Sequence, residues 1–253
     1  QKMLVHDACF GLKTVDQLNQ LDQSLAFQKN MKNHVNLLAK NQIGLKAIFE
    51  LVTIAHTERL TNSSANRAEN DGMSEPRITR ADIMRLRKDV LLGSSCFNGE
   101  LFELAANRSD DELIEAIKFY DYIEIQPLEN YRPLVENGSV PDMDRLKAIL
   151  TRLIQASIKL QKPVIASGDA HYLNPMDKKF RDVYIQAKGV GAGRHPLYIY
   201  NEVRRKSSIA PDQHFRTTDE MLEAFAYLGS DLAYRLVVLN PRFIANQIET
   251  VYA

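Results

Sequence analysis

The chain has 253 residues, of which 45% are hydrophobic, and it carries 32 basic and 32 acidic residues. This composition predicts a globular protein of one large or two small domains. The zero net charge argues against nucleic-acid binding through a surface that is basic all over. No apolar run approaches the ~20 residues that span a bilayer, and the N-terminus lacks a signal-peptide pattern, so we expect a cytoplasmic protein without membrane contact. The two cysteines, Cys9 and Cys96, are too few for a disulfide framework.

The N-terminal part is predicted to change from a connector to alternating strands and helices. Residues 1–33 are rich in Gln and Asn and show only a weak helical stripe, which predicts a connector. The apolar run at 35–39 predicts a strand, and the helical spacing of apolar residues in 44–55 predicts a helix followed directly by His56. Residues 61–76 have almost no apolar side chain, so we expect an exposed loop there.

The middle of the chain alternates short strands with longer helices. The apolar spacing predicts helices over 80–86, 98–106 and 110–119, and strands over 90–93 and 122–126. Ser109 and Glu112 have the spacing of a capping box at the start of the third of these helices. Cys96 closes the sequence GSSC, so we expect it just past a strand end.

The C-terminal half continues this alternation. Residues 142–160 are strongly amphipathic, which predicts a long helix packed on a sheet, and the apolar VIA at 164–166 predicts a strand. Another helix is predicted over 175–188, and Thr217 with Glu220 predicts a capped start for the last helices. Such alternation predicts an α/β fold with a parallel sheet, as a sandwich or a barrel, in which the carboxyl ends of the strands hold the chemistry.

Asp169 and His171 form the sharpest local feature, directly after the predicted strand at 164–166. Side chains two residues apart in an extended segment point to the same side, so a carboxylate oxygen and an imidazole nitrogen can reach one cation. The spacing therefore indicates a metal site. A turn capped by Asp169, with a surface histidine, is the alternative that the spacing leaves open.

His56 and Cys96 extend this candidate metal site, because each lies where a predicted element gives way to a loop. Imidazole and thiolate select zinc or similar transition metals, whereas a carboxylate also accommodates manganese or magnesium. The alternatives are a helix-terminal histidine stabilised by the helix dipole, and a buried cysteine that acts as a small apolar side chain. For His34, His195 and His214 we expect structural or solvent-facing roles.

Basic residues gather between Lys178 and Arg216, where nine of them stand against three acidic residues. The run Arg204, Arg205 and Lys206 in this stretch is a candidate for contact with phosphate groups. A solvated helix face and loop is the alternative. The sequence contains no nucleophile elbow, no phosphate-binding glycine loop and no CxxC pair, so it gives no signal for the enzyme classes that depend on them.

Five segments resemble, in order, the PHP (polymerase and histidinol phosphatase) region of the PolC-type bacterial DNA polymerase III alpha subunits. These segments are residues 34–56, 76–102, 119–131, 162–181 and 215–229. The sequences YDYIEIQP and FRTTDEML within them are distinctive of this polymerase type. The resemblance extends from His34 to the C-terminus, and it implies a connector over 1–33, the later part of a PHP domain over 34–214 and a helical exit segment over 215–253.

The resemblance implies a fold and a set of metal ligands. The fold is an α/β, PHP-type distorted β/α barrel, incomplete in this chain because the family's early strands and its opening HxH motif do not appear. The implied ligands are His56, Cys96, Asp169 and His171, with Zn²⁺ or Mn²⁺ in the PHP site and Mg²⁺ for the whole polymerase. In such clusters a metal acidifies water and neutralises phosphate charge, which is phosphoesterase chemistry.

Residues His6, Asp7 and Ala8 faintly resemble the end of the 3′–5′ exonuclease that is inserted within PHP in this family. The resemblance implies that Asp7 is the last catalytic, metal-binding carboxylate of that exonuclease. Lys2 stands where the motif has a histidine, which is a departure from the pattern. The loop over 61–76 is also longer than the family usually has beside the site.

The function implied is that of a fragment of a replicative DNA-directed DNA polymerase with an associated 3′–5′ exonuclease. Its partners would be DNA, other replisome subunits and the remainder of the polymerase chain. We expect the fragment alone to be inactive in synthesis, because the family's palm carboxylates follow this region. The alternatives are a free-standing PHP-superfamily metal-dependent phosphoesterase, which the missing HxH disfavours, and a structural module that braces polymerase and exonuclease.

Overall fold

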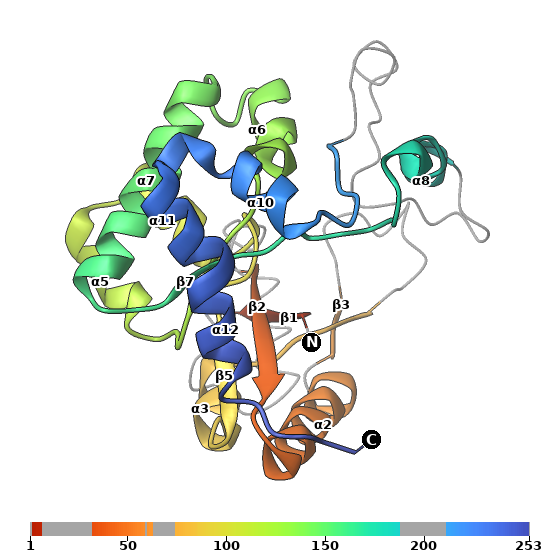
Figure 1. Ribbon diagram of the computed structural model, residues 1–253. Coiled ribbons are helices and arrows are strands. Elements are labelled where there is room, and N and C mark those ends of the chain that lie inside the picture. Colours follow the sequence, from red (N-terminus) through yellow and green to blue (C-terminus); the bar gives the residue numbers. More distant parts are fainter. Residues whose placement is uncertain (1, 7–31, 59, 63–73, 188–210, 253) are drawn as a thin grey trace. The chain divides into compact units, whose positions relative to one another are not determined.

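The computed structural model describes residues 2–6, 32–58, 60–62, 74–187 and 211–252 (Figure 1). The chain divides into two compact units. Unit 1 comprises Gln1–Glu124, Leu153–Val164 and Arg242–Ala253, and unit 2 comprises Ile125–Arg152 and Ile165–Pro241. Some residues singled out in the sequence lie outside the described part, namely Asp7, Cys9, His195, Arg204, Arg205 and Lys206.

A three-stranded sheet lies in unit 1. Its strands are, in order, β1 (Lys2–His6), β2 (Lys32–Ala39) and β5 (Val90–Gly93). Alternation along β2 buries Val35 and Leu37, while the alternate residues His34, Asn36 and Leu38 are only partly buried. Leu37 pairs with Leu92 of β5, a strand in which every residue is buried. The apolar runs at 35–39 and 90–93 therefore supply the core of this sheet.

The predicted parallel arrangement is wrong for this sheet, because β2 pairs antiparallel with both β1 and β5. The chain between β2 and β5 contains two helices and a further strand pair instead of a single crossover helix, so β5 can enter the sheet from the opposite end. The expected connector over 1–33 also begins with a strand, β1, and ends in the first residues of β2. The prediction of a mixed α/β fold is confirmed.

Two helices and a short strand pair connect β2 to β5. Helix α2 (Gln42–Thr57) begins at Asn41, whose side chain accepts hydrogen bonds from two backbone amides of the first turn. Helix α3 (Arg80–Leu86) begins at Thr79 with a capping box. Strands β3 (Leu60–Asn62) and β4 (Ser74–Pro76) pair antiparallel, so the ends of the expected loop over 61–76 are strands. Backbone hydrogen bonds make this pairing, and they require no apolar side chains.

Strands β6 (Ile123–Ile125) and β7 (Val164–Ala166) form a separate two-stranded sheet. Ile123 N donates to Pro163 O, and Ser167 N donates to Ile125 O, so the bonds advance in the same direction along both strands, as in a parallel pair. Helix α7 (Met143–Lys159) connects them, which confirms the predicted long helix between two strands. The described strands thus form three small sheets and no closed barrel.

The remaining helices are short. Two of them, α4 (Glu100–Asn107) and α5 (Asp110–Ile117), lie wholly in unit 1, and the predicted capping box of Ser109 and Glu112 at α5 is confirmed. The others are η4 (Leu128–Tyr131), α6 (Arg132–Glu136), η5 (Pro175–Asp177), α8 (Lys178–Gln186), α10 (Thr218–Ala224), η6 (Ala226–Leu228), α11 (Ser230–Tyr234), the π-helical η7 (Arg235–Leu239) and α12 (Asn240–Ala245). None of the helices in the described ranges combines the length and the apolar character required to cross a bilayer.

Candidate functional site

Asp169 and His171 follow β7 directly, and the structure brings their side chains together. Asp169 Oδ2 lies 3.7 Å from His171 Nε2, and both side chains are partly exposed. The backbone of Asp169 is left-handed, with φ of 48°, a conformation that Asp tolerates better than most residues because its short polar side chain can bond locally. The arrangement leaves an oxygen and a nitrogen ligand facing one small volume.

Gln213 and Asn130 hold this segment in place. Gln213 Nε2 donates to Asp169 Oδ2 at 3.2 Å, and His171 N donates to Gln213 O at 2.8 Å. Asn130 Nδ2 donates to Gly168 O at 3.2 Å, and both amide side chains are buried. A buried donor of this kind fixes the rotamer of the carboxylate that it contacts. No local pattern in the sequence indicated either residue, because both are about 40 positions from the groups that they contact.

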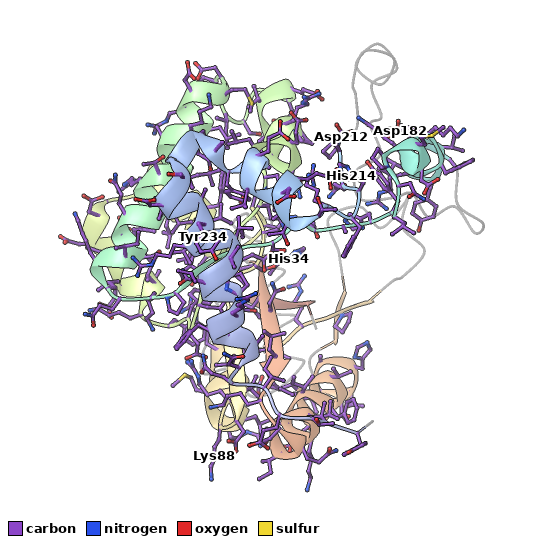
Figure 2. The ribbon with its side chains drawn as sticks, in the orientation of Figure 1. His34, Lys88, Asp182, Asp212, His214 and Tyr234 are labelled. Carbon is purple, nitrogen blue, oxygen red and sulfur yellow. The ribbon has the colours of Figure 1, made fainter. Side chains whose placement is uncertain are left out.

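His214 is largely buried beside acidic residues, which agrees with the structural one of the two roles expected for it. Its Nε2 lies 3.5 Å from Glu220 Oε1, and its side chain is only 15% exposed. Figure 2 shows His214 and Asp212 on the segment that leads into α10. Thr217 and Glu220 form the predicted capping box at the start of that helix, which is confirmed. This capping lowers the pKa of Glu220, since the backbone amide and the hydroxyl of Thr217 bond the charged form, with His214 adding a smaller effect.

The Asp212 carboxylate is expected to become protonated only at a pH below the usual pKa range of an aspartate. A hydrogen bond from Lys178 Nζ, at 2.7 Å, is the main cause of its lowered pKa; burial opposes it, and the charges of Lys178, Arg216 and His214 assist. A carboxyl group whose pKa is lower in the folded than in the unfolded chain stabilises the fold at any pH above its unfolded pKa. This stabilisation is lost as the pH falls through the pKa of the folded state. NMR titration should find the Asp212 midpoint raised in Lys178→Gln, and an unchanged midpoint would contradict the assignment.

Cys96 has a histidine neighbour that the sequence did not predict. Its Sγ lies 3.6 Å from Nδ1 of His34, a residue of β2, and Cys96 is a free, buried cysteine. His34 N donates to Asn98 O at 3.0 Å, which ties the strand to the loop that carries the cysteine. The two residues are 62 positions apart, so no local pattern could have revealed the contact. An imidazole and a thiol at this distance are both potential transition-metal ligands.

His56 lies in the last turn of α2 and is exposed. Its Nδ1 is 2.8 Å from the carbonyl oxygen of Val52, one turn earlier. His56 and Cys96 belong to unit 1, whereas Asp169 and His171 belong to unit 2. Within the described ranges, no three His, Cys, Asp or Glu side chains are grouped so that they could hold a metal ion. The four-ligand set therefore stays a prediction.

A cavity of about 250 Å³ lies beside Asp169 within unit 2. One wall is the segment after β7, with Gly168, Asp169 and Ala170. The other residues around it come from the approach to α10, from α10 itself and from the helical run that follows, and they are Phe215, Arg216, Thr218, Met221, Val237 and Pro241, together with Ala166 of β7. The site thus combines a candidate metal-binding pair with a partly open cavity beside it.

No family model matches the chain. The chain is similar over most of its length to proteins named DNA polymerase III PolC-type. The protein of that name from Bacillus subtilis (strain 168) is 38% identical over 251 residues, which are 99% of this chain and 16% of that protein. The one from Latilactobacillus sakei subsp. sakei (strain 23K) is 39% identical over 243 residues, 96% of this chain and 15% of that protein. The chain therefore spans about one sixth of the length of these curated relatives.

Proposed function

This chain is homologous to one segment of PolC-type DNA polymerase III, and from that premise we propose that the segment is the metal-binding PHP region of a replicative DNA polymerase. The resemblance to this polymerase type is confirmed by relatives 38% and 39% identical to the chain. The observation that carries the metal-binding part is the Asp169 and His171 pair at the carboxyl end of β7.

The geometry of this pair supports a shared metal ion. Two ligands that each lie about 2.1 Å from one tetrahedral ion are roughly 3.4 Å from each other. Asp169 Oδ2 and His171 Nε2 are 3.7 Å apart, so a small rotation of either side chain suffices. Gln213 donates to the same carboxylate oxygen and so fixes its position, as partners outside the ligand shell do in metal sites. Zn²⁺ or Mn²⁺ fits a set of one carboxylate and one imidazole.

The proposal includes His56 and Cys96 as further ligands of the same centre. The burial of Cys96 and its contact with the His34 imidazole support a role as a soft metal ligand. The finer fold assignment, a distorted PHP-type barrel over 34–214 with a helical exit segment over 215–253, belongs to the same proposal. The pairing of β6 with β7 through helix α7 supports it, because a β/α barrel is built from such units.

For the whole protein we propose template-directed DNA synthesis with Mg²⁺, an associated 3′–5′ exonuclease, and DNA and replisome subunits as partners. Asp7 as an exonuclease carboxylate, and Arg204, Arg205 and Lys206 as DNA phosphate contacts, are part of this proposal. Contacts between basic side chains and DNA phosphates release counterions, so the DNA affinity that they supply would fall as the salt concentration rises. They would show no sequence preference. The homology to PolC-type polymerases supports these assignments.

The chain is expected to copurify with a transition metal, and the double variant Asp169→Ala/His171→Ala is expected to lose at least half of it. The reason is that both replaced side chains are direct ligands in this proposal. Elemental analysis of protein purified without chelator measures the effect. Asp144→Ala is the matched control, because its side chain is 93% exposed on helix α7 and should leave the metal content unchanged. Equal metal content in the wild type and the double variant would contradict the proposed metal site.

A further inference from the structure

Helix α8 and the chain just before it expose a group of large apolar side chains (Figure 1). Its members lie close together in the sequence, and they are Leu173, Met176, Phe180, Val183 and Tyr184. Their exposed fractions range from 64% for Phe180 to 77% for Met176. Single apolar side chains are common on protein surfaces, whereas a group of them marks a surface that binds another molecule.

Four of these side chains share one side of the helix. Met176, Phe180, Val183 and Tyr184 are spaced i, i+4, i+7 and i+8, which places them on one helical face. Met176 belongs to the 3₁₀ turn η5, which leads directly into α8. We call these four residues the α8 face. In a globular domain such a stripe packs on the core, so its exposure on this helix requires a separate explanation.

The side of α8 opposite this stripe anchors the helix. It carries Ile185, which is 2% exposed. It also carries Lys178, whose Nζ lies 2.7 Å from Asp212 Oδ1, so the first residue of α8 is tied to the segment before α10. These two interactions hold the helix with its apolar stripe outward. Rotation of the stripe toward the core would break both of them.

The charges beside the α8 face are mainly positive. Lys179 Nζ lies 5.0 Å from the centroid of the Phe180 ring, and Arg181 Cζ lies 6.0 Å from the centroid of the Tyr184 ring. Asp182, labelled in Figure 2, is the one acidic residue in the sequence of α8. A partner surface with carboxylates at its edge would therefore complement this face. Aromatic, Met and Arg side chains are also the types enriched where proteins contact one another.

The homology of the chain indicates what covers this face. The segment that matches the PolC-type protein of Bacillus subtilis is 16% of that protein, so most of that polypeptide lies outside the match. A surface through which two domains of one polypeptide pack becomes an exposed apolar patch when one of them is considered alone. Nucleic-acid bases would stack on the two aromatic rings but would leave Met176 and Val183 without a matching contact. The aliphatic half of the face therefore favours a protein surface.

We propose that the α8 face packs against another segment of the same, longer polypeptide, and that this segment presents an apolar surface edged by carboxylates. The contact is an interface between domains of one chain. Phe180 and Tyr184 are its central side chains, because aromatic residues buried at the centre of an interface contribute most to its stability. The inference does not depend on the proposed metal site, since no residue of the α8 face is a candidate ligand.

The test is oxidative footprinting of the full-length protein, with mass spectrometry of the peptide that contains Met176. Oxidation of a methionine follows its exposure to solvent. In the full-length protein Met176 is expected to be oxidised about fivefold more slowly than in the same protein unfolded in urea, because the proposed contact buries it. A rate close to that of the unfolded protein would overturn the proposal.

The double variant Phe180→Asp/Val183→Asp of the full-length protein tests whether the α8 face itself makes the contact. Oxidation of Met176 is expected to return to near the unfolded rate, because two carboxylates cannot enter an apolar contact without a large desolvation cost. Phe49→Asp is the matched control, since Phe49 is 55% exposed on α2, and it should leave Met176 protected. Continued protection of Met176 in the double variant would reject the assignment.

Two further measurements separate the other possible occupants of the α8 face. Protection of Met176 that disappears when the protein is diluted from dimer to monomer would identify a second copy of the protein as the partner. Protection that appears only after a thymidine oligonucleotide is added would identify single-stranded DNA. Either result would overturn the proposal, which requires protection in the DNA-free monomer.

Discussion

Replacement of Arg80 by Met is expected to lower the free energy of unfolding by about 3–5 kcal/mol, because it removes the cation paired with a largely buried carboxylate. Arg80 forms an ion pair with Glu100, whose side chain is 10% exposed. Tyr120 also donates its hydroxyl to Glu100 at 2.8 Å, and the Arg80 guanidinium lies 4.5 Å from the centroid of the Phe119 ring. The variant therefore removes a charge pair and a cation–π contact while it leaves the carboxylate in place.

Arg85→Met is the matched control for this prediction, since Arg85 lies on the same helix, α3. Its partner Glu50 is 3.2 Å away, but the two side chains are 57% and 45% exposed. Exposed pairs of this kind contribute roughly 0–1 kcal/mol, because water screens them. Guanidinium denaturation of both variants measures the difference. Similar losses in the two would show that burial of the Arg80 pair has no special effect.

Replacement of Leu92 by Ala is expected to cost roughly 3–5 kcal/mol of unfolding free energy, because it leaves a cavity in a core that cannot fully collapse. Leu92 is fully buried in β5, where it pairs with Leu37 of β2. Its backbone is also fixed, since Leu92 N donates to Asp121 Oδ2 and Leu92 O accepts from Asp121 N. Backbone relaxation toward the cavity is therefore restricted.

Leu239→Ala is the control for the core variant, because Leu239 is 50% exposed. It should cost less than about 1 kcal/mol, as surface truncations usually do. Urea denaturation, with the midpoint and the slope fitted together, measures the unfolding free energy of both variants. A loss for Leu239→Ala as large as that for Leu92→Ala would contradict the role assigned to the β2 and β5 core.

Most of the helices, the apolar strands and the relationship to PolC-type polymerases could be predicted from the sequence alone. The predicted bounds of α3 and β5 agree with the structure residue for residue, and both predicted capping boxes are present. These features depend on interactions within one helical turn or on a short apolar run, so the residues that decide them are close in sequence. The similarity to PolC-type proteins likewise needs only the order of motifs.

The strand directions and the surroundings of the candidate site residues depend on long-range packing, so they became visible only in the structure. The antiparallel pairing of β2 with β5 and the pairing of β3 with β4 depend on how the connecting segments pack. Gln213 reaches Asp169 from 44 positions away, and His34 reaches Cys96 from 62 positions away. The hydrophobic periodicity of a segment predicts whether that segment is a helix or a strand. It carries no information about which distant segment will pack against it.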